Sequence, residues 1–134
     1  MFVEWAKSYF MKEKKVPETI IIYLEGMSSP QTLSQLRNTT VPALLNMIKI
    51  IGEKTKTKDY KPELMIVVAN KKINTRFFEK RKHDYYNPQS GSVIIEPLST
   101  DGEYDFYLAS QYVSQGTCTP TQFKVAYDTT TMPQ

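Results

Sequence analysis

The stretch LMIVVA at residues 64–69 decides the fold of this chain. It is a continuous apolar run rich in β-branched side chains, and such a run indicates a strand that is buried on both faces. A second run of this kind, IIIYL at residues 20–24, comes earlier in the chain. Strands with two buried faces are typical of parallel sheets covered by helices, so both segments are predicted to lie in such a sheet.

Helical periodicity precedes and separates the two predicted strands. Apolar residues recur at helical spacing near the N-terminus, which predicts an amphipathic helix over residues 2–14. The same spacing predicts helix over residues 30–54, where Pro42 leaves two alternatives: two helices, or one helix kinked near the proline. A strand, helix, strand order with buried strands predicts a parallel pair and an α/β fold.

Shorter strands are predicted in the second half of the chain. Alternating apolar residues favour strands near 92–95, 104–108 and 123–127, which makes the predicted sheet mixed rather than purely parallel. Residues 129–134 contain no such pattern and are predicted to fray.

The composition limits the class of protein. A chain of 134 residues fits one domain, and its apolar runs are far shorter than the roughly 20 residues that cross a bilayer, so no membrane partner is expected. The N-terminus carries no secretory pattern, which predicts an intracellular protein of the cytoplasm or the nucleus. Cys118 is the only cysteine, which excludes an internal disulfide and a zinc site of paired cysteines.

The positive charge is concentrated in one place. The chain has a net charge of +3, but residues 71–82 contain six cations and one acid, a local net charge of +5, whereas residues 83–134 carry −5. This basic stretch is interleaved with amide, hydroxyl and aromatic side chains, a mixture that suits a polyanionic backbone. A plain solvated surface loop is the alternative.

Two candidate sites follow the predicted strands. Ligands of open α/β sheets bind outside the carboxyl ends of the strands, which places Glu25 and residues 70–78 at one edge. Glu25 is either a Mg²⁺ ligand or base, or merely solvated. Neither following loop is rich in glycine, as a phosphate cradle requires, and His83 and Cys118 lack the neighbours of a catalytic nucleophile.

Longer motifs resemble a known family. The segments PETIIIYLEG (17–26), YKPELMIVVANKKINTRFF (60–78), NPQSGSVII (87–95) and YDFYLASQYVSQGTCTPTQFKVAYD (104–128) occur in the order and spacing of the PIWI domain of the argonaute superfamily. They resemble the Piwi clade more closely than the argonaute clade. The resemblance implies an RNase H-like mixed sheet flanked by helices.

The PIWI domain is about twice as long as this chain, so residues 1–134 resemble its central to C-terminal portion. The resemblance therefore implies a partial domain that is incomplete at both ends, with the first catalytic aspartate expected before Met1 and the last catalytic ligand after Gln134. An incomplete product that does not fold stably is a further interpretation, since missing strands leave an unpaired sheet edge.

The resemblance also bears on catalysis. The second catalytic aspartate of slicing members lies in a YRDG motif, and Tyr23, Leu24, Glu25 and Gly26 match it here. Glu25 thus occupies a degenerate catalytic and metal position, and its longer side chain displaces the ligating oxygens beyond the tolerance of such a site. Active members use Mg²⁺, but no cofactor is expected for this chain and cleavage by it is not expected. The alternative is a fragment of a slicer, an RNA-guided endonuclease whose other ligands lie outside the chain.

The family's RNA-binding positions match better. Through the resemblance, Lys71, Lys72 and Arg76 are expected to contact guide phosphates, and a second group of positions belongs to the later motif. The second group consists of Gln111, Gln115, Thr117 and Thr119. The expected partners are a small guide RNA, its target RNA and the remaining argonaute-type domains, with a role in RNA-guided gene silencing.

Overall fold

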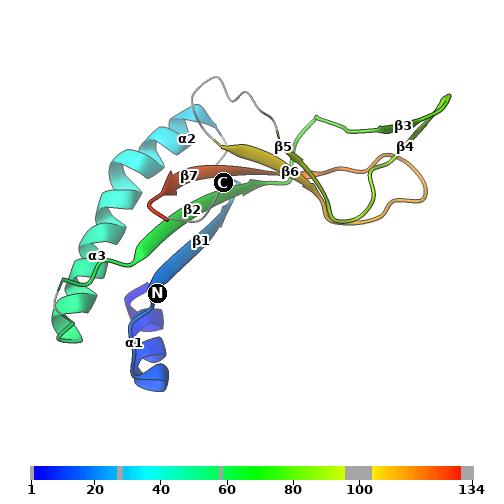
Figure 1. The fold of residues 1–134 in the computed structure, drawn as a ribbon. Helices are drawn as coiled ribbons and strands as arrows, with labels where there is room; N and C mark the ends of the chain where they lie inside the picture. Colours follow the sequence, from blue (N-terminus) through cyan, green and yellow to red (C-terminus); the bar gives the residue numbers. More distant parts are fainter. Residues whose placement is uncertain (1, 27–28, 58, 96–103, 131–134) are drawn as a thin grey trace.

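The computed structural model describes residues 2–26, 29–57, 59–95 and 104–130, and its sheet is built around β2 (Glu63–Asn70) (Figure 1). β1 (Thr19–Glu25) pairs with β2 in parallel, with Ile20 opposite Leu64 and Glu25 opposite Ala69. The predicted parallel pairing of the two apolar runs is therefore confirmed.

The remaining strands add to β2 on its other side. β7 (Thr121–Asp128) runs antiparallel to β2, and β6 (Asp105–Ala109) and β5 (Ser92–Ile95) follow in antiparallel order. The five-stranded order is β1-β2-β7-β6-β5, with a bulge in the β2–β7 pairing between Ile66 and Val67. The mixed sheet flanked by helices is confirmed.

The helical region between β1 and β2 is continuous. α2 (Pro30–Gln35) passes through a π-helical turn, η1 (Leu36–Thr40), into α3 (Val41–Lys54), and the N–H of Val41 donates to the carbonyl of Leu36. Pro42 cannot donate a backbone hydrogen bond, and its ring would clash with the carbonyl of residue 38 in a regular α-helix. The wider π-helical turn before Pro42 relieves this clash, so the helix continues. The alternative of one distorted helix is the one that the structure contains.

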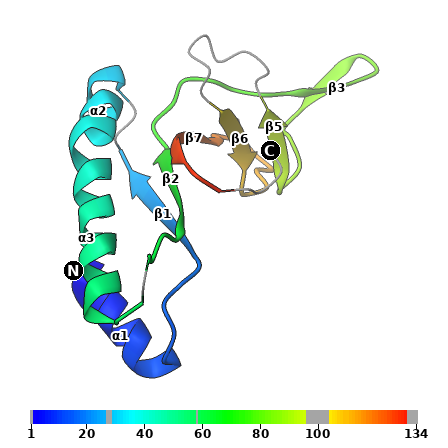
Figure 2. The same cartoon turned by 60° about the vertical axis from the view of Figure 1, so that its left-hand side comes forward.

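One face of the sheet packs against these helices (Figure 2). The core contains helical residues, including Leu36 and Ile48, and strand residues, including Leu64, Ile66 and Val68. α1 (Phe2–Glu13) lies beyond the start of β1, one residue shorter than predicted because Lys14 takes a left-handed φ of 56°. The helices thus leave the carboxyl ends of β1 and β2 accessible.

The other face, here called the open face, is not covered by α2 and α3. The prediction that β1 is buried on both faces is wrong, because Ile21 and Tyr23 on this face are 44% and 67% exposed. β1 is an edge strand with alternating burial, so only its helix-facing side chains are buried. The register places Glu25 on the open face, in line with Ala69 and Phe123.

The basic stretch leads into a hairpin that the sequence did not predict. β3 (Glu79–Arg81) pairs antiparallel with β4 (Asp84–Tyr86), and the hairpin projects from the body of the protein (Figure 1). Lys82, in the turn, has a φ of 54°. All six strand residues are exposed, so no buried apolar pattern marked these strands.

The predicted fraying does not begin at residue 129. The N–H of Thr129 donates to the carbonyl of Leu64, and its hydroxyl oxygen accepts from the N–H of Leu64 at 2.8 Å. These bonds extend the β2–β7 pairing beyond the end of β7. Residues 131–134, the rest of the predicted tail, lie outside the described residues. Among the helices of the described residues, none is long and apolar enough to cross a bilayer.

Candidate nucleic-acid interface

Two irregular segments leave the sheet side by side at the carboxyl end of β2. The β2 exit segment comprises residues 71–78, and the β6–β7 loop comprises residues 110–120. Asn70 pairs with Gln122 at the start of β7, and Thr121 pairs with Leu108 near the end of β6, which fixes this proximity (Figure 1). The predicted RNA-binding positions all lie in these two segments, so the structure brings them to one end of the sheet.

The first two lysines of the β2 exit segment lie at its base. Nζ of Lys71 is 3.2 Å from Oε1 of Glu25, and both side chains are mostly exposed. Lys72 is exposed, and its backbone N–H donates to Oδ1 of Asn70. The predicted edge that joins Glu25 to the basic stretch is present, but Glu25 there pairs with a cation of that stretch.

Arg76 shapes its own segment. Nη1 of Arg76 donates to the carbonyl oxygens of Ile73 at 2.7 Å and Thr75 at 2.8 Å. A guanidinium has five N–H donors, and Nε and Nη2 of this exposed side chain have no hydrogen-bond partner among the described residues. The charge of Arg76 is therefore held close to the backbone in one orientation, which favours recognition of a fixed anion.

The two aromatic residues of the β2 exit segment differ in role. The rings of Phe77 and Tyr107 meet edge to face with centroids 5.0 Å apart, which anchors the segment on β6. Phe78 is 53% exposed. The sequence pattern did not distinguish these two residues, whereas in the structure Phe77 anchors the segment and Phe78 is exposed.

Asn87 holds the β6–β7 loop in place, and the sequence did not single it out for this role. Its Oδ1 accepts from the N–H of Cys118 at 2.9 Å, and its Nδ2 donates to the carbonyls of Val113 and Gly116. Gly116 has a φ of 86°, a conformation that glycine adopts without steric cost. One side chain therefore fixes the loop at three points.

The β6–β7 loop alternates buried and exposed residues after Gly116. Cys118 and Pro120 are buried, and the Cys118 thiol lies 3.7 Å from the carbonyl oxygen of Gln111. The predicted RNA-binding positions of the loop are all exposed: Gln111, Gln115, Thr117 and Thr119. The buried residues thus fix a backbone from which amide and hydroxyl groups reach solvent.

The residues around Glu25 do not fit a two-metal site. The carboxylate of Glu25 already pairs with Lys71, and no three His, Cys, Asp or Glu side chains of the described residues converge on a common point. Asp105 pairs with Lys124 at 3.0 Å on the helix-facing side of the sheet. Asp128 lies opposite Met65, whereas Glu25 lies opposite Ala69. These two positions on β2 are four residues apart, which separates Asp128 from Glu25 by roughly 13 Å along the strand direction alone.

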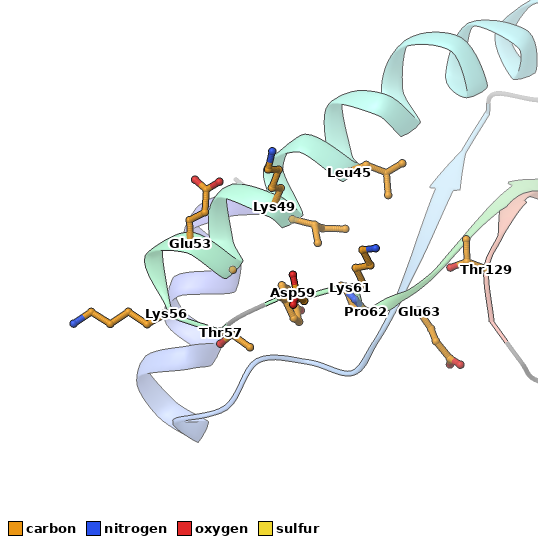
Figure 3. Close-up of a pocket in the computed structure, with 13 residues that line it drawn as sticks. Leu45, Lys49, Glu53, Lys56, Thr57, Asp59, Lys61, Pro62, Glu63 and Thr129 are labelled. Atoms are coloured by element: carbon orange, nitrogen blue, oxygen red, sulfur yellow. The ribbon is translucent and has the colours of Figure 1, made fainter.

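A pocket of about 850 Å³ lies at the opposite end of the sheet, beside the second half of α3 (Figure 3). Its charged lining is balanced, with three lysines and three acids, and Lys56 extends away from it. Burial raises the pKa of Tyr60, which lines the pocket and donates a hydrogen bond to the carbonyl of Pro17. A lining with equal numbers of cations and acids gives no preference for a polyanion, so this pocket differs in charge from the candidate interface.

Known proteins resemble this chain over most of its length. Piwi-like protein 1 of Gallus gallus is 36% identical over 123 residues, and Piwi-like protein Ago3 of Bombyx mori is 38% identical over 120 residues. These alignments cover 92% and 90% of this chain but only 14% and 12% of the two relatives. The chain thus spans about one eighth to one seventh of the length of these curated relatives.

Solved structures share the fold. The crystal structure of Drosophila Piwi superposes with a TM-score of 0.79 at 27% identity and covers 99% of this chain and 17% of that one. Kluyveromyces polysporus Argonaute with a guide RNA superposes with a TM-score of 0.81 at 19% identity, over 98% of this chain and 17% of that one. The predicted RNase H-like fold is confirmed. The Piwi domain model matches residues 1–134, so this chain belongs to the Piwi domain family.

Proposed function

We propose that this chain is the part of a Piwi-like protein that holds a small guide RNA in RNA-guided gene silencing. The observation that carries the proposal is the meeting of the β2 exit segment and the β6–β7 loop at one end of the sheet. One segment supplies cations and the other supplies neutral hydrogen-bonding groups. The guide RNA, its target and the remaining argonaute-type domains are the proposed partners.

The charges of the β2 exit segment support contact with a phosphate backbone. Lys71, Lys72 and Arg76 are exposed within six residues of chain, and only Lys71 has an acidic partner among the described residues. Lysine and arginine that neutralise phosphates contribute affinity without reading base sequence. A protein that accepts guides of many sequences requires this kind of contact.

The β6–β7 loop supports the same proposal with uncharged groups. Its exposed amides and hydroxyls can form hydrogen bonds with phosphate oxygens or with ribose 2′-hydroxyls. The 2′-hydroxyl is the group that distinguishes RNA from DNA. Asn87 and the buried Cys118 hold the loop in one conformation before any ligand binds. A preformed loop loses little conformational entropy on binding, which favours affinity.

RNA cleavage by this chain is the alternative function, and its residues do not favour it. Two-metal hydrolysis needs several ligands that converge on both ions, whereas Glu25 is a single carboxylate beside an ammonium group. We therefore assign Glu25 to the electrostatics of the interface.

The salt dependence of RNA binding tests the proposal. Affinity for a labelled single-stranded RNA of mixed sequence is measured by fluorescence anisotropy over a range of salt concentrations. Each lost phosphate contact lowers the log–log slope by about 0.7 on a single strand, so Lys71→Ala with Arg76→Ala should lower it by about 1.4. The matched control is Lys12→Ala with Lys49→Ala, which removes two exposed lysines from α1 and α3.

The control variant should keep the wild-type slope, because its lysines lie away from the carboxyl end of β2. Equal slopes for the wild type and the Lys71/Arg76 variant would show that the β2 exit segment does not contact the guide. Equal losses in both double variants would show that binding depends on net charge alone.

A further inference from the structure

The β3–β4 hairpin directly follows the β2 exit segment in the chain, and the residue after β4 contacts the β6–β7 loop. Just before it, Phe77 packs on Tyr107 of β6, and just after it, Asn87 binds the β6–β7 loop. The base of the hairpin is therefore anchored to β6 and to the β6–β7 loop, while its arms of three residues extend roughly 10 Å further. Figure 1 shows it projecting on the side where β2 ends.

One face of the hairpin is occupied by its own contacts. Arg81 donates from Nε and Nη2 to the two carboxylate oxygens of Glu79, at 2.9 and 2.7 Å. The Arg81 guanidinium also lies 5.4 Å from the ring centre of Tyr86. The hydrogen bonds from Arg81 lower the pKa of Glu79, and this carboxylate in turn raises the pKa of Arg81. With Asp84 opposite Arg81, this face has no cation left over.

The second face has a different character. Lys80 lies directly opposite Tyr85 in the register, so their side chains stand next to each other on the face away from Arg81. The Tyr85 side chain is 67% exposed, and Lys80 has no acidic partner among the described residues. The hairpin thus presents one cation and one aromatic ring together on its second face.

We propose that Lys80 and Tyr85 form a second nucleic-acid contact, in which the Tyr85 ring stacks on an unpaired base and Lys80 binds an adjoining phosphate. The inference rests on the proposed function, since it requires a strand that passes along the carboxyl end of β2. A nucleic-acid strand that runs along the β2 exit segment comes within reach of the hairpin that follows this segment. Stacking of this kind accepts every base, because each base offers a flat face.

The combination of groups favours single-stranded nucleic acid over an acidic protein segment. An acidic peptide would use the ammonium of Lys80 but would leave the exposed ring of Tyr85 without a flat partner. A nucleotide supplies a phosphate and a planar base a few ångströms apart, as the cross-strand pair does.

The test compares single variants of the full chain in binding to the same labelled RNA at several salt concentrations. Lys80→Ala should lower the log–log salt slope by about 0.7, because one phosphate contact is lost. Tyr85→Ala should weaken binding about fivefold or more with an unchanged slope, because stacking releases no counterions, and Tyr85→Phe should bind like the wild type. The controls are Lys49→Ala and Tyr9→Ala, which changes an exposed tyrosine of α1 away from the carboxyl end of β2.

The outcomes separate this inference from the proposed function. If Lys71→Ala with Arg76→Ala lowers the slope while Lys80→Ala and Tyr85→Ala bind as the wild type does, the hairpin contact is wrong and the proposed function stands. If Tyr9→Ala weakens binding as much as Tyr85→Ala, a specific role of the hairpin is refuted. If the hairpin variants alone weaken binding, the second contact exists and the proposed role of the β2 exit segment fails.

Discussion

Nζ of Lys71 lies 3.2 Å from Oε1 of Glu25, across the point where the parallel strands β1 and β2 both end. Two residues that the family resemblance predicted to be a catalytic position and a guide-binding position therefore neutralise each other. An exposed ion pair of this kind contributes only about 0–1 kcal/mol to stability. In the proposed interface, exchanging this partner for a phosphate would therefore cost Lys71 little, and the charge of Glu25 would compete with the phosphate.

Glu25→Gln should strengthen RNA binding. The variant removes the carboxylate that competes with phosphate for Lys71, so affinity should rise and the salt slope should become steeper by up to about 0.7. Anisotropy titrations at several salt concentrations measure both quantities. Glu13→Gln is the matched control, because Glu13 lies 3.9 Å from Lys12 in another exposed pair on α1. Equal gains in both variants would show that only the net charge matters.

The chain and its Glu25→Asp variant should not cleave RNA. A shorter carboxylate at residue 25 does not supply the other ligands that two Mg²⁺ ions require. The measurement is incubation of each purified protein with guide-paired labelled RNA in Mg²⁺ or Mn²⁺, followed by gel analysis. Site-specific cleavage that EDTA and Glu25→Ala both abolish would contradict the prediction.

Asn87→Ala should loosen the β6–β7 loop and expose Cys118. The variant removes three hydrogen bonds and leaves the N–H of Cys118 unpaired, which should cost about 2–3 kcal/mol of unfolding free energy. Because Cys118 is the only cysteine, its labelling rate with a thiol reagent reports loop opening directly. Labelling should be faster in Asn87→Ala and unchanged in Asn38→Ala, which removes one exposed helical bond. Unchanged labelling of Asn87→Ala would mean that the loop is held by other contacts.

Tyr60 should make the chain less stable in alkali. Burial raises its folded pKa above 10.0, so the unfolded chain loses this proton first as the pH rises, and stability falls from about pH 10 upwards. Tyr60→Phe also loses the hydrogen bond to Pro17, which should cost about 1 kcal/mol at neutral pH. Urea unfolding at about pH 8 and about pH 11 should show the advantage of the wild type shrinking with pH. A constant difference would contradict this.

The apolar runs of β1 and β2 predicted their parallel pairing. Apolar, β-branched side chains indicate a buried strand, and buried strands are typical of parallel sheets. The same rule failed for one face of β1. Ile21 and Tyr23 have the composition of a buried strand, yet β1 lies at the sheet edge, and a strand's position in the sheet depends on segments far away in sequence.

The family motifs predicted which residues gather at the carboxyl end of β2, but not what orders them. Asn87 precedes a proline and is typical of a turn, whereas its hydrogen-bond partners lie 26 to 31 residues further along the chain. Local patterns do not encode such a pairing. The hairpin was missed for a related reason, since its short exposed strands carry no apolar alternation.

The strand order has a consequence for how the chain is synthesised. β7, the last described strand to leave the ribosome, lies between β2 and β6. Until residues 121–128 emerge, β1–β2 and β5–β6 are two separate hydrogen-bonded pairs, each with an unpaired edge that can capture another nascent chain. A ribosome that stalls before β7 would therefore release two half-sheets rather than a smaller version of the fold.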